Sequence, residues 1–287
     1  KVQGTQFPAG GSGRRPDVTP YKEKKMPNAS TSFFGWVAFL LQKYGMLFLR
    51  GTGMTLLIAL TGTALGFALG LLVAIIRTIA LPEKKKAGSN AGVIVKRGLL
   101  RFVHMLMNVY IQVFRGTPMI VQAVVIYYGA QYAGVFMDTT FAAVFIISIN
   151  TGAYMAEIIR GGIVSVDKGQ FEAAHAIGMT HWQTMTTVVL PQAIRNILPS
   201  VGNELIVNIK DSSVLNVISV SELFFQAKSA AGTYYRYFEV YFIIAVIYLI
   251  LTLTVSRILR AVEKKMDGPD NYVIHGSQLS LIHISEP

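Results

Sequence analysis

The stretch that decides the fold is GTGMTLLIALTGTALGFALGLLVAII, residues 51–76, which contains no charged residue. At 26 residues it exceeds the roughly 20 that an α-helix needs to cross the hydrocarbon core of a bilayer. Gly62, Gly66 and Gly70 are spaced four apart and so share one helical face. Such a small-residue stripe lets a second helix approach closely, although glycine is also common filler in membrane helices. The sequence therefore predicts a membrane-spanning helix here.

The composition of the whole chain also indicates a membrane protein. Of its 287 residues 52% are hydrophobic and only 14% are charged, whereas soluble domains carry about 25% charged residues. The net charge of +11 comes from basic residues that flank apolar runs, which argues for contact with membrane lipid and against nucleic acid. The chain has no cysteine, and its five histidines have no metal-ligand spacing, so we expect no metal site.

Four further apolar runs are expected to cross the membrane, at 118–136, 139–159, 198–220 and 240–256. The segment 77–101 carries seven basic residues against one acid, which the positive-inside rule assigns to the cytoplasm. The apolar stretch after it is too long for one crossing at about 1.5 Å per residue. We therefore expect residues 102–114 to lie along the cytoplasmic interface and Pro118 to begin the second span. Five crossings place the N-terminus outside and the C-terminus inside.

The run 33–49 is apolar but interrupted by Gln42 and Lys43, which is typical of an amphipathic helix at the membrane interface. The basic residues before it would favour a sixth crossing at 33–49, but only Arg50 would separate that crossing from the next span. We therefore expect five spans. The predicted organisation is a disordered arm over 1–32, a transmembrane domain over 33–268 and a disordered or artefactual tail over 269–287.

The predicted cytoplasmic loop, 160–197, contains the stretch Glu172-Ala173-Ala174-His175-Ala176-Ile177-Gly178, followed later by Leu190-Pro191. Its alanines favour a short helix, and Gly178 can end that helix in the left-handed conformation. A short capped helix with a small-residue face is suited to docking in a groove of another protein, although surface helices with alanines are commonplace. Trp182, in the same loop, is expected to anchor the chain at the membrane interface.

The spacing of this stretch is more specific than its composition. The pattern E-A-A, three residues, G, nine residues, Val188, one residue and L-P resembles the cytoplasmic signature of ABC importer permeases. Three further segments, Phe114 to Pro118, Asn150 to Gly162 and Asn208 to Ser213, look like those of the polar amino acid permeases, the histidine, glutamine, arginine and opine uptake group. The resemblance covers residues 33–270, nearly the whole plausible fold.

This resemblance implies a type I ABC importer permease fold in a bacterial cytoplasmic membrane. It implies that a coupling helix sits on an ATP-hydrolysing subunit, and the motif residues for that role are Glu172, Ala173, Ala174, Gly178, Leu190 and Pro191. The implied partners are ABC ATPase subunits, a second permease chain, identical or similar, and an extracytoplasmic solute-binding protein. The chain has no G-x-x-x-x-G-K-[ST] phosphate loop, so we expect ATP and Mg²⁺ on the partner ATPase and no enzyme activity here.

Ionisable residues inside a membrane are costly and therefore candidates for function. Glu204, Asn208 and Asp211 are spaced four and three apart, so they share a helical face, and Lys210 is adjacent. Asn150, Tyr154 and Glu157 form a similar stripe in the third span. Together the two stripes could offer donors to the carboxylate and acceptors to the ammonium group of an amino acid.

Structural roles for these residues remain open from the sequence. Lys210 and Asp211 could neutralise each other or charges on neighbouring helices, and Glu157 could pair locally with Arg160, three residues on. Arg115, at the expected cytoplasmic mouth of the second span, could be a gate or a snorkelling anchor.

An alternative function is an ion-coupled secondary transporter with Glu204 and Asp211 as ion sites. Such folds usually show two homologous halves, and no internal repeat is visible in this sequence. A membrane enzyme or scaffold is a second alternative, but no nucleophile, metal or paired-carboxylate motif lies in a polar loop. Co-elution with an ATPase would separate an importer from an ion-coupled carrier.

Overall fold

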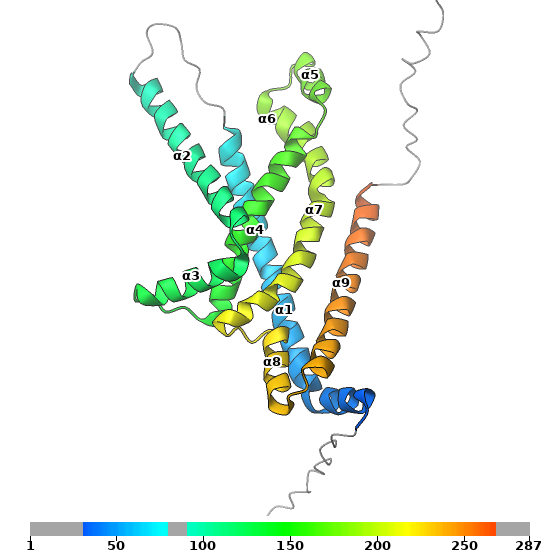
Figure 1. Ribbon diagram of the computed structural model, residues 1–287. Helices are drawn as coiled ribbons and strands as arrows, with labels where there is room; N and C mark the ends of the chain where they lie inside the picture. Colours follow the sequence, from blue (N-terminus) through cyan, green and yellow to red (C-terminus); the bar gives the residue numbers. More distant parts are fainter. Residues whose placement is uncertain (1–30, 80–90, 268–287) are drawn as a thin grey trace, which may run out of the picture.

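The computed structural model describes residues 31–79 and 91–267, and over these residues the chain is helical, with no β-strand. The elements are α1 (Phe33–Thr78), α2 (Ala91–Gly116), α3 (Met119–Tyr132), α4 (Thr139–Val164), α5 (Lys168–Ala176), α6 (His181–Gln183), the π-helix η1 (Thr184–Val189), α7 (Leu190–Asp211), the 3₁₀-helix η2 (Ser212–Ile218), α8 (Leu223–Tyr234) and α9 (Tyr237–Asp267) (Figure 1). The expected all-α fold is confirmed. Apart from Thr31 and Ser32, the predicted arm lies outside the described residues, as does the predicted tail.

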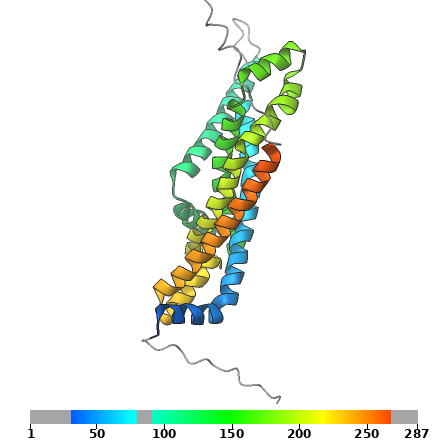
Figure 2. The same cartoon turned by 90° about the vertical axis from the view of Figure 1, so that its right-hand side faces the viewer.

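The first helix, α1, begins at Phe33, where the Ser32 side chain accepts a hydrogen bond from the N–H of Gly35. Its 46 residues would extend about 69 Å, more than twice the thickness of the hydrocarbon core, which is about 30 Å. Figures 1 and 2 show how the helix accommodates this length: its first part lies across the lower end of the bundle, and the rest rises through it. The interfacial helix expected at 33–49 is thus continuous with the first span.

The glycine stripe of α1 is the seam between α1 and α4. A Cβ added to Gly62, Gly66 or Gly70 would lie less than 3.0 Å from atoms of α4. The α4 residues that it would meet are Ile147, Thr151 and Met155, also spaced four apart. The close approach predicted from the sequence is therefore confirmed.

The second predicted span, 118–136, corresponds to a helix that is shorter than the sequence predicts. The helix here, α3, has only 14 residues, about 21 Å, and α2 and α3 meet at an angle of 114°. It is α2 that extends along the bundle beside α4, while α3 turns aside (Figure 1). Residues 102–114, expected at the interface, are the second half of α2. The break has a local cause, because Pro118 disfavours a helical conformation at the preceding residue.

A buried glutamine fixes this bend. The Gln122 side chain, 6% exposed, donates hydrogen bonds to the carbonyl oxygens of Phe114 and Thr117, both at 2.9 Å. These carbonyls lie in the last turn of α2 and just beyond it, where no further helical turn supplies N–H donors. The Asn150 side chain on α4 donates to Phe114 as well, at 3.3 Å, so the bend is attached to α4.

The fourth predicted span, 198–220, is displaced. The helix α7 begins eight residues earlier, at Leu190, and ends at Asp211, after which the chain forms the 3₁₀-helix η2 and Ser219 adopts a left-handed conformation with φ 64°. The helices α4 and α9 cover the predicted spans 139–159 and 240–256 and extend beyond them. By length and hydropathy, α1, α4 and α9 could each cross a membrane, and α2 with α3 could form one broken span.

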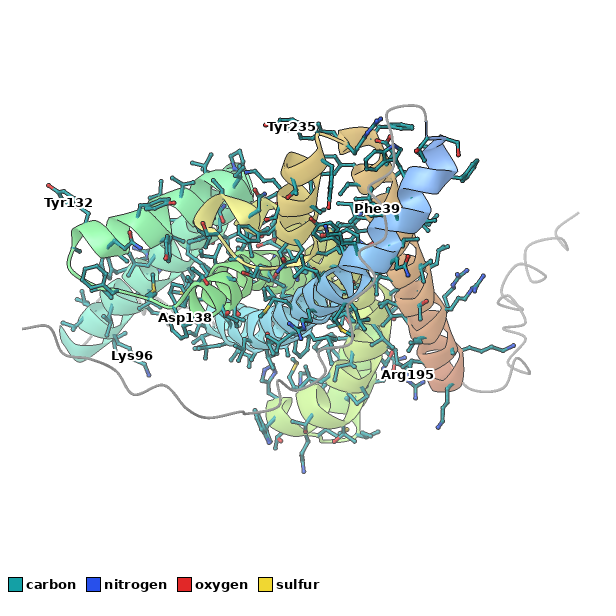
Figure 3. All side chains as sticks on the ribbon, turned by 90° about the horizontal axis from the view of Figure 1, so that it is seen from below. Phe39, Lys96, Tyr132, Asp138, Arg195 and Tyr235 are labelled. Carbon is teal, nitrogen blue, oxygen red and sulfur yellow. The ribbon has the colours of Figure 1, made fainter. Side chains whose placement is uncertain are left out.

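The two ends of the bundle differ in composition. The start of α2, the helix α5 and the end of α9 lie at the upper end in Figure 1, and these segments hold Lys96, Arg97, Arg101, Lys168, Arg257, Arg260, Lys264 and Lys265. Seen from below in Figure 3, Tyr132 and Tyr235 project outward at the rim, and they are 96% and 79% exposed. The upper end is therefore basic.

Candidate functional site: coupling helix and polar path

The short helix predicted for the E-A-A stretch is present as α5. The Asp167 side chain caps its start by accepting from the N–H of Gly169 at 2.5 Å. Its end is set by Gly178, which has φ 82°, the left-handed conformation that the sequence predicts for this glycine. The helix lies at the tip of the molecule, beyond the ends of α4 and α7 (Figure 1). It is therefore a short element that protrudes from the bundle.

The three residues of the E-A-A motif differ in exposure. Glu172 and Ala173 are exposed, whereas Ala174 is only 4% exposed. Inside the corner, Val166, Val189 and Ala193 form a buried cluster, and Phe171 packs against it. The motif thus presents Glu172 and Ala173 outward while Ala174 faces the molecule.

Two large apolar side chains near Gly178 were not among the predicted coupling residues. Ile177 is 79% exposed and Trp182 is 75% exposed, both in the protruding corner between α5 and α6. Trp182, which the sequence predicts to be an anchor at the membrane interface, lies in α6, in the corner that follows α5. The sequence offers one signal for both residues, which is their position. Ile177 directly precedes Gly178 of the motif, and Trp182 follows it by four residues.

The motif residues Leu190 and Pro191 lie apart from the exposed surface of α5. They open α7 directly after the π-helix η1, with Pro191 as its second residue. Leu190 is half-buried and Pro191 exposed. Their place is thus the junction between the coupling corner and α7.

Of the predicted path residues, Asn208 is enclosed within the bundle. It is 3% exposed, and its Nδ2 donates to Oγ1 of Thr63 on α1 at 2.8 Å and to Oγ1 of Thr151 on α4 at 2.9 Å. The Thr151 hydroxyl is also within 3.2 Å of Oδ1 of Asn208. This residue joins three helices and has no open surface to offer a solute.

Two residues of the α4 stripe are also engaged within the chain. Glu157 forms ion pairs with Arg77 at the end of α1 and, at 3.0 Å, with Arg160 on its own helix, so the local pair expected from the sequence is present. Asn150 donates at 2.9 Å to Oε1 of Gln122 and thereby helps to hold the α2–α3 bend. Both residues link helices to one another.

The remaining predicted residues form a looser group. The Arg115 guanidinium lies over the Tyr154 ring, 5.4 Å from its centroid, and both Arg115 and Asp211 act electrostatically on Glu204. Lys210 is exposed, and Glu204 and Asp211 are half-buried. Among the residues that the structure describes, none of Glu204, Lys210 and Asp211 belongs to an ion pair.

A buried carboxylate that the sequence reasoning did not single out lies at Glu222. Its side chain has no exposed surface and accepts hydrogen bonds from the N–H groups of Phe224 and Phe225, at 2.8 and 2.7 Å, and from the Tyr248 hydroxyl at 3.0 Å. It caps the start of α8 and ties α8 to α9. The available signal was a glutamate directly before an apolar helical run.

Both the sequence and the fold of this chain match those of known proteins. Residues 88–268 match the family described as the binding-protein-dependent transport system inner membrane component. The chain belongs to this family. The resemblance to permeases of ABC-type amino acid transporters is thereby confirmed, and the alternative of an ion-coupled carrier loses its support.

Relatives of this permease share most of its length. The glutamine transport system permease protein GlnP of Escherichia coli strain K12 is 40% identical over 222 residues, which are 77% of this chain and 93% of GlnP. The arginine transport system permease protein ArtQ of Bacillus subtilis strain 168 is 41% identical over 162 residues, which are 56% of this chain and 74% of ArtQ.

Solved structures show the same fold. A chain from the structure described as an amino acid ABC transporter with histidines is 38% identical, with a TM-score of 0.69, and the match covers 82% of this chain and 99% of that one. A chain of the MetNI methionine ABC transporter in an inward-facing conformation is 20% identical, with a TM-score of 0.60 and coverage of 78% and 98%. The permease therefore has the fold of type I ABC importer permeases.

Proposed function

We propose that this permease is one membrane-spanning subunit of an ATP-driven amino acid importer in a bacterial cytoplasmic membrane. It pairs with a second permease chain, identical or similar, and the pair rests on two ABC ATPase subunits that bind ATP and Mg²⁺. An extracytoplasmic solute-binding protein delivers the amino acid. The names of the relatives point to glutamine or arginine as the first solutes to test.

The observation that carries this proposal is the apolar tip beside α5. Ile177 and Trp182 are 79% and 75% exposed on a corner that protrudes from the bundle. Burying such side chains in a partner contributes roughly 1.5–3 kcal/mol for an aliphatic residue, and tryptophan is prominent among interface hot spots. The tip thus fits a groove on an ATPase, into which Glu172 and Ala173 also face.

The composition of the two ends supports the topology. Because positively charged loops stay in the cytoplasm, the basic end with α5 is the cytoplasmic one, and the end that exposes Tyr132 and Tyr235 is extracytoplasmic. Five crossings then comprise α1, α2 with the bent α3, α4, α7 and α9. The first part of α1 lies at the extracytoplasmic surface, and the C-terminus is in the cytoplasm.

The polar path is best assigned to the charges that the protein does not pair internally. Arg115 offers donors to a carboxylate, and Glu204 and Asp211 offer acceptors to an ammonium group. Asn150, Glu157 and Asn208 instead hold α1, α2 and α4 around this group. When the ATPases close, α5 moves with them and carries α4 and α7, whose movement exposes the path to one side and then to the other.

The decisive experiment removes the two apolar side chains of the tip. The double variant Ile177→Ala with Trp182→Ala should lower the affinity of the permease for the ATPase roughly thirtyfold or more. This is the effect of losing about 2 kcal/mol at a hot spot. ATP-dependent uptake of labelled glutamine and arginine should fall with it. The matched control is Phe136→Ala, which removes a side chain that is 83% exposed but lies outside this corner.

The readouts are co-elution of the ATPase with the tagged permease and uptake into membrane vesicles. We expect the control to keep both. If the double variant retains the ATPase and its uptake, the tip is not the docking surface. If the parent chain retains no ATPase at all, the importer assignment itself fails.

A further inference from the structure

The junction between the coupling corner and α7 contains an irregular helix. Residues Thr184–Val189 form the π-helix η1, and the N–H of Leu190 donates to the carbonyl of Met185, five residues earlier, where an α-helix would use the fourth. A π-helical turn holds one more residue than an α-helical turn, and such segments are rare and frequently found at functional positions. The one described here lies directly between the proposed docking corner and a proposed span.

Pro191 stands directly after the wide turn. Proline has no N–H, and in a regular α-helix its ring would collide with the carbonyl four residues earlier, that of Thr187. Widening the preceding turn moves that carbonyl away from the ring. Pro199, further along α7, stands inside regular α-helix, with no wide turn before it. The two prolines of α7 therefore make a matched pair.

Side chains within and beside the segment also bond back to preceding carbonyl groups. The hydroxyl of Thr184 donates to the carbonyl of Thr180 at 3.0 Å, and that of Thr186 donates to the carbonyl of Trp182 at 2.8 Å. Nε2 of Gln192 donates to the carbonyl of Val188 at 2.9 Å. Each bond reaches back four residues, a pattern that favours departure from regular helix. Such bonds from Thr184 and Thr186 favour bending of the helix at this place.

The wide turn sets which face of α7 meets α4. Beyond it, Ala193 and Ile197 pack against Gly162, where an added Cβ would lie 3.2 Å from the Ala193 carbonyl and still nearer to Ile197. Nδ2 of Asn196 donates to Oγ of Ser165 at 3.0 Å. Loss of the extra residue of the turn would rotate this face by one residue, about 100° at 3.6 residues per turn. The register of the α4–α7 contact depends on η1.

We propose that Pro191 is a positioning residue for transport: it keeps Thr184–Val189 π-helical, and this segment is the compliant joint through which movement of α5 reaches α7. The proposal rests on the proposed function, because it takes α5 as the element that the ATPase moves. It gives Pro191 a role inside the permease, apart from any contact with the ATPase.

The test compares Pro191→Ala with Pro199→Ala in the complete importer, reconstituted in liposomes with its ATPase and binding protein. Two quantities are measured: hydrogen exchange of the backbone amides at 184–192, and the amount of labelled glutamine or arginine taken up per ATP hydrolysed. Pro191→Ala should slow this exchange roughly tenfold, the effect of one net backbone hydrogen bond, and lower uptake per ATP severalfold. The ATPase should still co-elute. Pro199→Ala should leave both quantities at the parental level.

Each outcome decides the proposal. Unchanged exchange in Pro191→Ala would show that the proline does not maintain the wide turn, and slower exchange with parental uptake per ATP would show that the turn has no part in coupling. If Pro191→Ala does not assemble, deletion of the exposed Thr187 removes one residue of the turn with the proline in place, and parental uptake per ATP in that variant would overturn the proposal. Failure of the parent chain to retain an ATPase would instead refute the proposed function. The hydrogen-exchange comparison would still show whether Pro191 maintains the π-helical turn.

Discussion

Replacing Gly70 with alanine should destabilise the permease, whereas the same replacement of Gly53, on the same helix, should not. Gly70 packs against α4, where an added Cβ would lie 2.8 Å from the backbone nitrogen of Ala156 and 2.9 Å from the carbonyl oxygen of Gly152. Gly53 meets nothing within 4 Å. The backbone of α4 cannot move aside without shifting the whole helix, so the added methyl group must push the two helices apart.

The size of the effect follows from two opposing terms. Alanine favours a helix over glycine by about 1 kcal/mol at either position. Over-packing at Gly70 costs about 1–3 kcal/mol, so Gly70→Ala should lower the unfolding free energy by up to about 2 kcal/mol, and Gly53→Ala should raise it by up to about 1 kcal/mol. Since the helix-propensity term is common to both, the difference between the variants isolates the packing term of about 1–3 kcal/mol.

The measurement is equilibrium unfolding of the purified permease in mixed micelles, monitored by the loss of helical circular dichroism. Equal stability of the two variants would show that α1 and α4 do not approach as closely as described. Gly62 supplies an internal check, because there the nearest atoms belong to the Ile147 side chain. Gly62→Ala and Ile147→Ala should therefore be less than additive by about 0.5–3 kcal/mol, as is typical of residues in contact.

Two more predictions concern buried and capping polar groups. Asn208→Leu should lower the unfolding free energy by about 1–3 kcal/mol, because two threonine hydroxyls on α1 and α4 lose their partner; a parental stability would mean that Asn208 does not join these helices. At Asp138, hydrogen bonds from the N–H groups of Phe141 and Thr140 hold the pKa of the carboxyl below its ordinary 3.8. Its stabilising effect is therefore present above pH 3.8 and lost as the pH falls through the lowered pKa. Thermal unfolding from pH 6 to pH 2 should show a loss that Asp138→Asn lacks, and identical pH profiles would contradict the capping role.

Local patterns in the sequence predicted the parts of this structure that depend on local chemistry. The four-residue spacing of Gly62, Gly66 and Gly70 predicted a close helix contact, because glycine at that spacing leaves a continuous groove on one face. The positive φ of Gly178 followed from its place after an alanine-rich helix. In both cases the prediction follows from the backbone geometry of a single helix and does not depend on a distant residue.

The errors arose where distant contacts decide. Spacing placed Asn208 on one face with Glu204 and Asp211, but the helix packs so that Asn208 meets α1 and α4 while the other two remain half-buried. Nothing in the spacing says which partner lies opposite a given face. The same holds for Glu222, whose partner Tyr248 lies 26 residues further on.

The helix α7 departs from regular geometry at both of its ends, and this arrangement connects the proposed joint with the polar path. It follows a π-helix at Thr184–Val189 and leads into a 3₁₀-helix at Ser212–Ile218, next to Asp211. Irregular backbone at membrane depth persists only where protein buries it or where it lines a water-filled cavity. In the joint that we propose, α7 would move as one helix between the π-helix and the 3₁₀-helix. Movement of α5 by the ATPase would then reach Asp211 and Glu204 as a rotation of α7, and the Pro191→Ala variant tests the first link of this chain directly.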